Sequence, residues 1–276
     1  MIELGNYNTL KVLRSTSIGL FLGDEEGTEV LLPNKYVPDD FEIDGDLEVF
    51  CYLDNGERPI ATTLKPFVKR NGFAFLKVVE VGAYGAFMDW GLEKHLLVPF
   101  REQGVEMEQG KKYVVHCYLD EKTFRLTGSS RLNKFLSNEG FALEVNSEVE
   151  IMISRKTPLG REVIIEDKYK GLIFESDIFK PIAIGDRMKG YIKAVRPDNK
   201  VDISLQQIGA KMLEPTAKFI FEKLQENNGF LALHDKSTPE EIKDTLHLSK
   251  KAFKKAIGTL YKERKITIAD DGIYLL

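Results

Sequence analysis

Apolar residues in the first two-thirds of the chain come in short runs separated by glycine, proline, asparagine and aspartate. Short apolar runs bounded by turn residues predict β-strands. In the clearest stretch, five such runs follow one another, with the longest connection between the third and the fourth. The five predicted strands are 73–81, 86–90, 96–99, 112–119 and 123–128.

This stretch is one copy of an internal repeat. The segment 10–63 recurs 66 residues later as 76–129 without a gap, and the identical pairs include Gly19/Gly85 and Phe21/Phe87. A period of this length with five strands in each copy indicates small repeated β-domains rather than a solenoid. Five short strands with a long connection after the third fit the five-stranded OB barrel.

A third, more diverged copy follows at an initial offset of 75 residues, which aligns Gly85 with Gly160 and Gly110 with Gly185. Between the second and third copies, the segment 131–140 ends at a glycine and predicts a short helix that acts as a spacer. The first two-thirds of the chain therefore predicts three barrels in tandem.

The last quarter of the chain changes from the apolar spacing of strands to that of helices. A helix at 214–227 and a short strand at 229–234 come first. A second helix opens at Thr238 with a capping box, a third opens at Ser249, and 265–276 predicts a hairpin. Helix, strand, helix, helix and hairpin is the order of the winged helix.

We therefore predict a multidomain, mainly β fold, with three tandem five-stranded OB barrels followed by an α+β winged-helix domain. A chain of 276 residues ordinarily holds about two domains, so these units are small. The predicted domains are an acidic first barrel at 1–64, a second barrel at 65–130, a helical spacer at 131–142, a third barrel at 143–209 and the winged helix at 210–276.

The net charge of −4 is unevenly distributed along the chain. Residues 1–64 hold 4 Lys/Arg against 13 Asp/Glu, a net of −9, whereas residues 65–276 hold 35 against 30, a net of +5. Overall acidity argues mildly against a nucleic-acid-binding protein. Because the acidity is concentrated in the first barrel, that objection does not extend to the rest of the chain.

The chain opens with no basic segment followed by an apolar one, and no apolar run approaches the roughly 18 residues of a membrane span. We therefore expect a cytoplasmic protein that does not contact membranes. Its two cysteines, Cys51 and Cys117, stand at equivalent positions of the first and second barrels. Equivalent core positions of separate barrels are too far apart for a disulfide, so both are expected to be buried thiols.

The second barrel resembles the S1 RNA-binding domain in its Tyr84-Gly85-Ala86-Phe87 and Leu97-Val98-Pro99 motifs and in the strand that begins after Gly110-Lys111. Three such barrels followed by a winged helix resemble the bacterial conserved virulence factor B family over essentially the whole chain. The resemblance implies a protein that binds RNA and is linked to the control of gene expression. The third-strand histidine usual in S1 domains is replaced in all three barrels, and only the second barrel keeps the aromatic pair of the family motif.

Tyr84 and Phe87 are candidates for a base-stacking platform, since every base offers a π face. The alternative for Phe87 is packing inside the barrel. Nearby basic residues are candidate phosphate contacts, although each is alternatively an ordinary solvated charge. These candidates are Lys77, Lys94, Arg101 and Arg125 in the second barrel, and Arg155, Lys156 and Arg161 in the third. In the third barrel the basic path continues through Lys168 and Lys170, and interspersed acids make a solvated mixed surface an equal alternative.

The third helix of the winged helix has two distinct faces. Its predicted apolar face comprises Ala252, Phe253, Ala256, Ile257, Leu260 and Tyr261, and its basic face Lys251, Lys254, Lys255 and Lys262. Lysines at the position of a recognition helix can contact phosphates. The helix lacks the arginine, asparagine and glutamine side chains that make bidentate base contacts, which argues against sequence-specific DNA reading. A solvated lysine face is the alternative.

The sequence contains no motif typical of catalysis, and its four histidines stand apart from any metal-binding spacing. We therefore expect no enzyme activity, cofactor or metal. The leading hypothesis is single-stranded RNA binding by a composite surface of the second and third barrels and the winged helix, in post-transcriptional control of gene expression. The alternatives are a protein–protein adaptor on a ribosome or RNA-processing complex, docked through the acidic first barrel, and a winged-helix DNA regulator.

Overall fold

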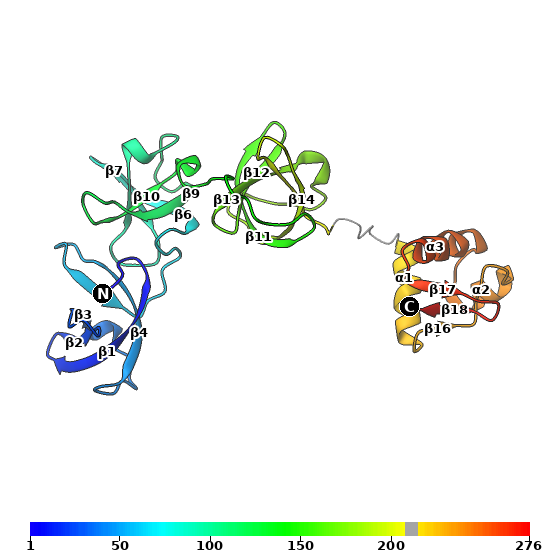
Figure 1. Ribbon diagram of the computed structural model, residues 1–276, viewed down its shortest axis with the longest axis horizontal. Helices are drawn as coiled ribbons and strands as arrows, with labels where there is room; N and C mark the ends of the chain where they lie inside the picture. Colours follow the sequence, from blue (N-terminus) through cyan, green and yellow to red (C-terminus); the bar gives the residue numbers. More distant parts are fainter. Residues whose placement is uncertain (208–214) are drawn as a thin grey trace. The chain divides into compact units, whose positions relative to one another are not determined.

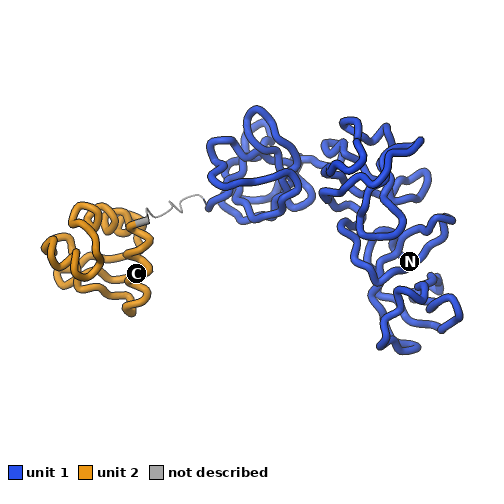
Figure 2. Tube along the Cα trace, turned by 180° about the vertical axis from the view of Figure 1, so that it is seen from behind, with its two compact units in different colours: residues 1–207 blue, residues 208–276 orange. Residues whose placement is uncertain are grey.

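The computed structural model describes residues 1–207 and 215–276 (Figure 1). The chain divides into two compact units, 1–207 and 208–276 (Figure 2). The predicted boundary between the third barrel and the winged helix, at residues 209 and 210, lies outside the described residues. Within the described parts, no helix is long and apolar enough to cross a membrane.

The first barrel is a closed five-stranded sheet in the order β1-β2-β3-β5-β4. Side chains alternate along its strands, so that Leu10, Val12 and Leu20 lie in the core, each at most 3% exposed. A parallel pair between Leu31 and Ile60 closes the barrel. The elements are β1 (Tyr7–Thr16), β2 (Gly19–Gly23), β3 (Glu29–Pro33), the 3₁₀ turn η1 (Asn34–Tyr36), β4 (Asp46–Leu53) and β5 (Pro59–Thr62).

The second barrel has the same strand order but remains open between β8 and β10. These two strands meet through side chains instead of a backbone ladder, since a Cβ added to Gly128 of β10 would lie 2.7 Å from Val98 Cγ2 of β8. All five predicted strands are present, but the sheet does not close into a complete barrel through backbone hydrogen bonds. The elements are β6 (Phe73–Gly82), β7 (Gly85–Asp89), β8 (Leu96–Pro99), η2 (Phe100–Glu102), β9 (Lys112–Leu119) and β10 (Leu126–Ser129).

The third barrel is again closed, in the order β11-β12-β13-β15-β14. At its second strand, Gly160 occupies the same place as Gly19 and Gly85 in the other barrels, and all three have φ of 148° to 150°. A Cβ there would lie 2.0 to 2.2 Å from a carbonyl oxygen of the neighbouring strand, so only glycine fits. The elements are β11 (Glu148–Thr157), β12 (Gly160–Ile165), β13 (Tyr169–Phe174), η4 (Glu175–Asp177), β14 (Arg187–Val195) and β15 (Val201–Ser204).

The spacer between the second and third barrels differs from the predicted helix. Only one 3₁₀ turn forms there, η3 (Leu132–Lys134). The residues that follow this turn contact both barrels. The Phe135 ring stacks on His116 of the second barrel, with the ring centroids 4.1 Å apart. The Asn138 amide donates to the backbone oxygens of Lys170 and Asn199 in the third barrel. Contacts to two barrels require extended chain, which a helix would shorten.

The second unit has the element order predicted for a winged helix. The predicted capping box is present: the Thr238 hydroxyl accepts from Glu241 N, and the Glu241 carboxylate accepts from Thr238 N. The Ser249 hydroxyl caps α3 by accepting from Ala252 N. The elements are α1 (Pro215–Glu226), β16 (Phe230–Leu231), α2 (Pro239–Leu246), α3 (Lys250–Lys262), β17 (Ile266–Ile268) and β18 (Ile273–Leu275).

Candidate nucleic-acid interface

Tyr84 and Phe87 both lie on the outside of the second barrel, on the β6–β7 hairpin. Tyr84 is 77% exposed. Phe87 is half-buried and points outward, because its strand neighbours Ala86 and Met88 fill the core. The ring of Phe87 covers Gly82, where an added Cβ would lie 3.1 Å from Cε2 of the ring. The structure therefore favours the outward placement of Phe87 over the interior alternative.

Both aromatic side chains line a cleft of about 580 Å³, which we call the aromatic cleft. The cleft lies between the first and second barrels, with Tyr52 and Asn55 on one side and Trp90 on the other. It also contains three carboxylates, from Glu57, Glu80 and Glu93. Carboxylates at a phosphate-binding surface oppose binding, so stacking rather than charge is the chemistry that this cleft offers.

Two residues of the aromatic cleft that were predicted to contact phosphate, Lys94 and Arg125, bind groups of the first barrel instead. Lys94 is half-buried, and its ammonium group donates to the backbone oxygens of Leu53 at 3.0 Å and Asp54 at 2.7 Å. Burial lowers the pKa of Lys94, although the charge of Asp54 opposes that shift. Arg125 forms an ion pair with Glu57. In this structure both cations hold the barrels together rather than stand free for phosphate.

An aromatic core shared by the first two barrels reinforces these contacts. The Trp90 ring meets Phe50 edge-on at a centroid distance of 5.9 Å and Tyr52 at 6.4 Å. These side chains belong to one buried cluster that continues into the second barrel through residues such as Val68. Packing of the first barrel against the second therefore helps to hold the walls of the aromatic cleft in place.

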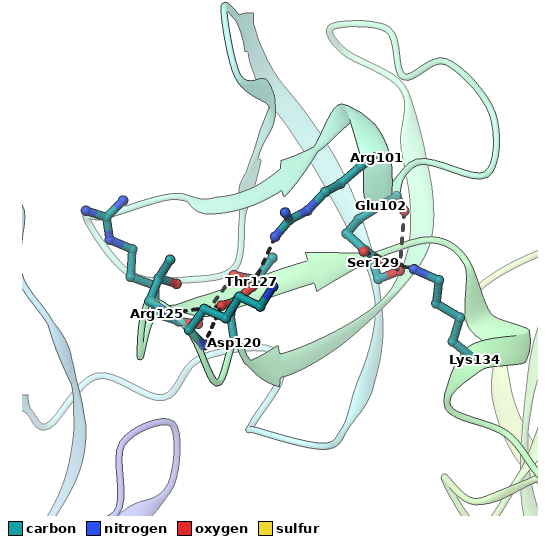
Figure 3. A network of polar contacts seen from close by, with 9 residues as sticks. Arg101, Glu102, Asp120, Arg125, Thr127, Ser129 and Lys134 are labelled. Carbon is teal, nitrogen blue, oxygen red and sulfur yellow. Dashed lines mark hydrogen bonds and ion pairs between the residues drawn. The ribbon is translucent and has the colours of Figure 1, made fainter.

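The other basic candidates of the second barrel lie outside the aromatic cleft. Arg101 is exposed and pairs with Asp120 at 3.1 Å (Figure 3). Backbone N–H groups, chiefly that of Thr123, lower the pKa of the Asp120 carboxyl, so the pair is charged at neutral pH. Lys77 is exposed on β6, where it stands opposite Asp89 of β7.

The same close-up shows how the spacer is attached to the second barrel (Figure 3). Glu102 is buried, accepts from the Ser129 hydroxyl at 2.7 Å and forms an ion pair with Lys134 at 3.0 Å. Hydrogen bonds from Ser129 and Lys134 lower the pKa of Glu102 against the opposing effect of its burial. A charged carboxylate thus fixes the start of the spacer.

The basic candidates of the third barrel divide into paired and unpaired groups. Arg155 binds Glu162 through two hydrogen bonds of 3.0 and 2.6 Å. Arg161 is mostly buried and pairs with Glu175 at 2.9 Å. Lys156 is exposed, and no residue that the structure describes forms an ion pair with it. Of these three, Lys156 has the cation most accessible to a phosphate.

The winged helix presents its predicted basic face to solvent. Lys251, Lys254, Lys255 and Lys262 are all exposed on α3. The opposite face packs into the core through Phe253, Ala256, Ile257 and Leu260. The exception is Tyr261, which was predicted on the apolar face and is 57% exposed, because it follows Leu260 at the edge of that face.

A groove between the second and third barrels brings two lysines of the predicted basic path of the third barrel, Lys156 and Lys170, together with basic residues that were not predicted to lie beside them. It is lined by Lys112 of β9, Arg131 of the spacer and Lys170 of β13, together with the predicted Lys156. These side chains come from segments far apart in the sequence, and no local spacing connects them. The sequence indicated the basic path of the third barrel and the excess of basic residues after the first barrel, but not that Lys112 and Arg131 join that path.

Both cysteines and His116 are buried. Burial raises the pKa of both cysteine thiols, Cys51 and Cys117, to about 12, and both are free. Burial lowers the pKa of His116 to about 4. Throughout residues 1–207 and 215–276, no three His, Cys, Asp or Glu side chains are grouped so as to hold a metal ion.

Comparison with known proteins identifies two domains of the chain. Residues 4–64 match the model of the S1 domain, and residues 218–275 match that of the CvfB-like winged helix domain. Both domain types bind nucleic acids. The S1 match covers the first barrel, whereas the aromatic motif noted in the sequence lies in the second.

Relatives of similar length match nearly the whole chain. "Uncharacterized protein YitL" of Bacillus subtilis (strain 168) is 29% identical over 95% of this chain and 90% of its own length. "Conserved virulence factor B" of Staphylococcus aureus (strain N315) is 26% identical over 99% of this chain and 94% of its own length. A solved multidomain protein with nucleic acid binding domains from Streptococcus pneumoniae TIGR4 is 24% identical, with a TM-score of 0.46, over 99% of this chain and 98% of that one. The two domain matches and the relatives bear out the resemblance noted in the sequence: the chain is similar to the conserved virulence factor B proteins over nearly its whole length, and its two ends match the S1 domain and the CvfB-like winged helix domain.

Proposed function

We propose that the chain is a non-enzymatic protein that binds single-stranded RNA and acts in post-transcriptional control of gene expression. The observation that carries the proposal is the outward placement of Tyr84 and Phe87 on one hairpin of an OB barrel. Each base stacked on an aromatic side chain contributes about 1 to 3 kcal/mol. Stacking requires unpaired bases, which favours a single strand over a duplex.

Phosphate contacts supply the second part of the proposed affinity. On the winged helix, Lys251, Lys254 and Lys262 are exposed and form no ion pair with any residue that the structure describes. Such cations attract phosphates of any sequence. Because these lysines carry no bidentate base-reading group, the expected binding has little sequence preference.

The first barrel favours a second candidate function, that of a protein-binding adaptor. Its 13 carboxylates repel nucleic acid. At the place that Tyr84 occupies in the second barrel, the first barrel has Ile18, an exposed aliphatic side chain. Phe21, which matches Phe87, is already covered by the Arg14 guanidinium group at 4.2 Å from the ring centroid. An acidic surface of this kind is better suited to a basic protein segment than to RNA.

A direct comparison of ligands tests the main proposal. The full chain is titrated into a fluorescent single-stranded RNA and into a duplex DNA of the same length at the same salt, and the anisotropy is measured. We expect tighter binding of the single strand and affinity that falls as salt rises. Equal or tighter binding of the duplex would support a DNA-binding role, and no binding of either would support the adaptor.

A further inference from the structure

The second and third barrels enclose a groove of about 750 Å³ that lies outside the aromatic cleft. We call it the inter-barrel groove. Its lining residues belong to β6 and β9 of the second barrel, the spacer, and β11, β12 and β13 of the third barrel. Val105 and Ile184 lie in it as exposed apolar side chains. Apolar surface beside polar groups suits a ligand that has both flat faces and charges.

The inter-barrel groove is strongly basic. Its lining includes one carboxylate, Glu162, and six basic side chains, which are Lys112, Arg131, Lys134, Arg155, Lys156 and Lys170. Arg155 is neutralised by Glu162, and Lys134 by the buried Glu102. The other four basic side chains have no carboxylate partner anywhere in residues 1–207 or 215–276.

The shape of the groove is fixed by packing between the two barrels. Leu136 of the spacer joins Phe73 and Val114 of the second barrel and Met152 and Ile164 of the third in one buried cluster. The guanidinium group of Arg187 donates to the backbone oxygen of Phe73 at 2.7 Å. A groove with walls in contact holds its cations in place before any ligand arrives, which reduces the entropy lost on binding.

Two further contacts involve the ring of Phe75, which lines the inter-barrel groove. Gly185 of the third barrel, with φ of 93°, lies so close to Phe75 that an added Cβ would be 2.2 Å from the ring. The ammonium group of Lys112 lies 5.9 Å from the centroid of the same ring. Phe75 and Lys112 both line the groove, and the Lys112 ammonium group lies within range of a cation–π contact with the ring.

We propose that the inter-barrel groove binds the sugar–phosphate backbone of single-stranded nucleic acid through Lys112, Arg131, Lys156 and Lys170. The inference rests on the proposed function and adds a second site to it. Four unpaired cations against one already paired carboxylate match the repeating negative charge of a strand. The aromatic cleft, with its three carboxylates, lacks this match, so the two sites divide stacking and charge between them.

Charge neutralisation in the full chain tests the groove. The groove variant carries K112Q, R131Q, K156Q and K170Q. The control variant carries K65Q, K69Q, K122Q and K180Q, which remove the same charge from exposed side chains outside both the groove and the aromatic cleft. Thermal unfolding of both variants is measured first, and each is expected to unfold near the wild-type temperature because the altered side chains are exposed.

The readout is the slope of log affinity against log salt for a fluorescent oligouridine. The groove variant should lose about 0.7 of slope for each phosphate contact removed, up to about 3 in all. The control variant should keep the wild-type slope. If the wild type binds and the two variants have equal slopes and affinities, the groove proposal is wrong while RNA binding stands. If the wild type does not bind at all, the proposed function itself fails.

Discussion

Glu57 of the first barrel and Arg125 of the second form an ion pair at the edge of the aromatic cleft. The pair joins the acidic barrel to the barrel that holds Tyr84. It also neutralises Arg125, which was predicted from the sequence to bind phosphate. Lys94 is engaged in the same way by two carbonyl oxygens of the first barrel. The first barrel therefore lowers the positive charge available at the aromatic cleft.

Releasing Arg125 should strengthen RNA binding. In Glu57→Gln the guanidinium group loses its carboxylate and one repelling charge leaves the cleft. An exposed ion pair contributes about 0.2 to 1 kcal/mol, which corresponds to a gain in affinity of up to about fivefold. The matched control is Glu25→Gln, an exposed carboxylate of the same barrel outside the cleft. Equal affinities of the two variants, measured by anisotropy, would show that the ion pair does not compete with RNA.

Removing the Tyr84 ring should weaken RNA binding without affecting the fold. Tyr84→Ala removes one stack, worth about 1 to 3 kcal/mol. Ile18→Ala is the matched control, because Ile18 is the residue 66 positions earlier and is 58% exposed. Phe87 is less suitable for this test because its ring covers Gly82. Equal RNA affinities of the two variants in titrations at one salt would remove Tyr84 from the interface.

Neutralising the lysines of α3 should flatten the salt dependence of RNA binding. Lys251, Lys254 and Lys262 changed together to glutamine should lower the slope by about 0.7 for each lost contact on a single strand. Lys243→Gln, on α2, is the control for loss of one exposed charge from the same unit. A triple variant with the wild-type slope and affinity would assign this helix to protein contacts.

His116 should make the second barrel less stable as the pH falls. Its Nδ1 atom is buried without a partner among the described residues, and burial lowers its pKa from 6.5 to about 4. The unfolded chain therefore binds the proton more tightly, so the stabilising contribution is complete above pH 6.5 and is lost as the pH falls towards 4. Between pH 7 and pH 5 the loss is about 2 kcal/mol.

His116→Phe isolates that contribution, because Phe50 occupies the equivalent position of the first barrel. The variant should lose less free energy of unfolding than the wild type between pH 7 and pH 5, as measured by urea denaturation. Identical pH dependence of the two proteins would mean that His116 titrates normally in the folded state.

The fold was largely predictable because each barrel repeats the same local pattern. Gly19, Gly85 and Gly160 align in the sequence, and the structure shows why: at each position a Cβ would collide with a carbonyl oxygen of the neighbouring strand. The capping box at Thr238 was equally local. The spacer was not predictable from its own residues, since Phe135 and Asn138 are held by contacts with the barrels on either side.

The candidate site was predictable only in part, since the state of a cation depends on residues distant in the sequence. Tyr84 and Phe87 could be found because their motif is contiguous. The partners of Arg125 and Lys94 lie on the first barrel, and nothing near either residue indicates them. The inter-barrel groove was harder still to predict, because basic residues of the two barrels meet there only when the barrels pack together.

Photocrosslinking tests the central claim most directly, that a single strand of RNA lies on the outer face of the second barrel. A single-stranded oligonucleotide containing 4-thiouridine is bound to the full chain and irradiated, and the attached peptides are identified by mass spectrometry. We predict attachment at the β6–β7 hairpin, at Tyr84 or Phe87, and its loss in Tyr84→Ala when the adduct is on that ring. Efficient attachment confined to the first barrel, with none on the hairpin, would contradict the claim.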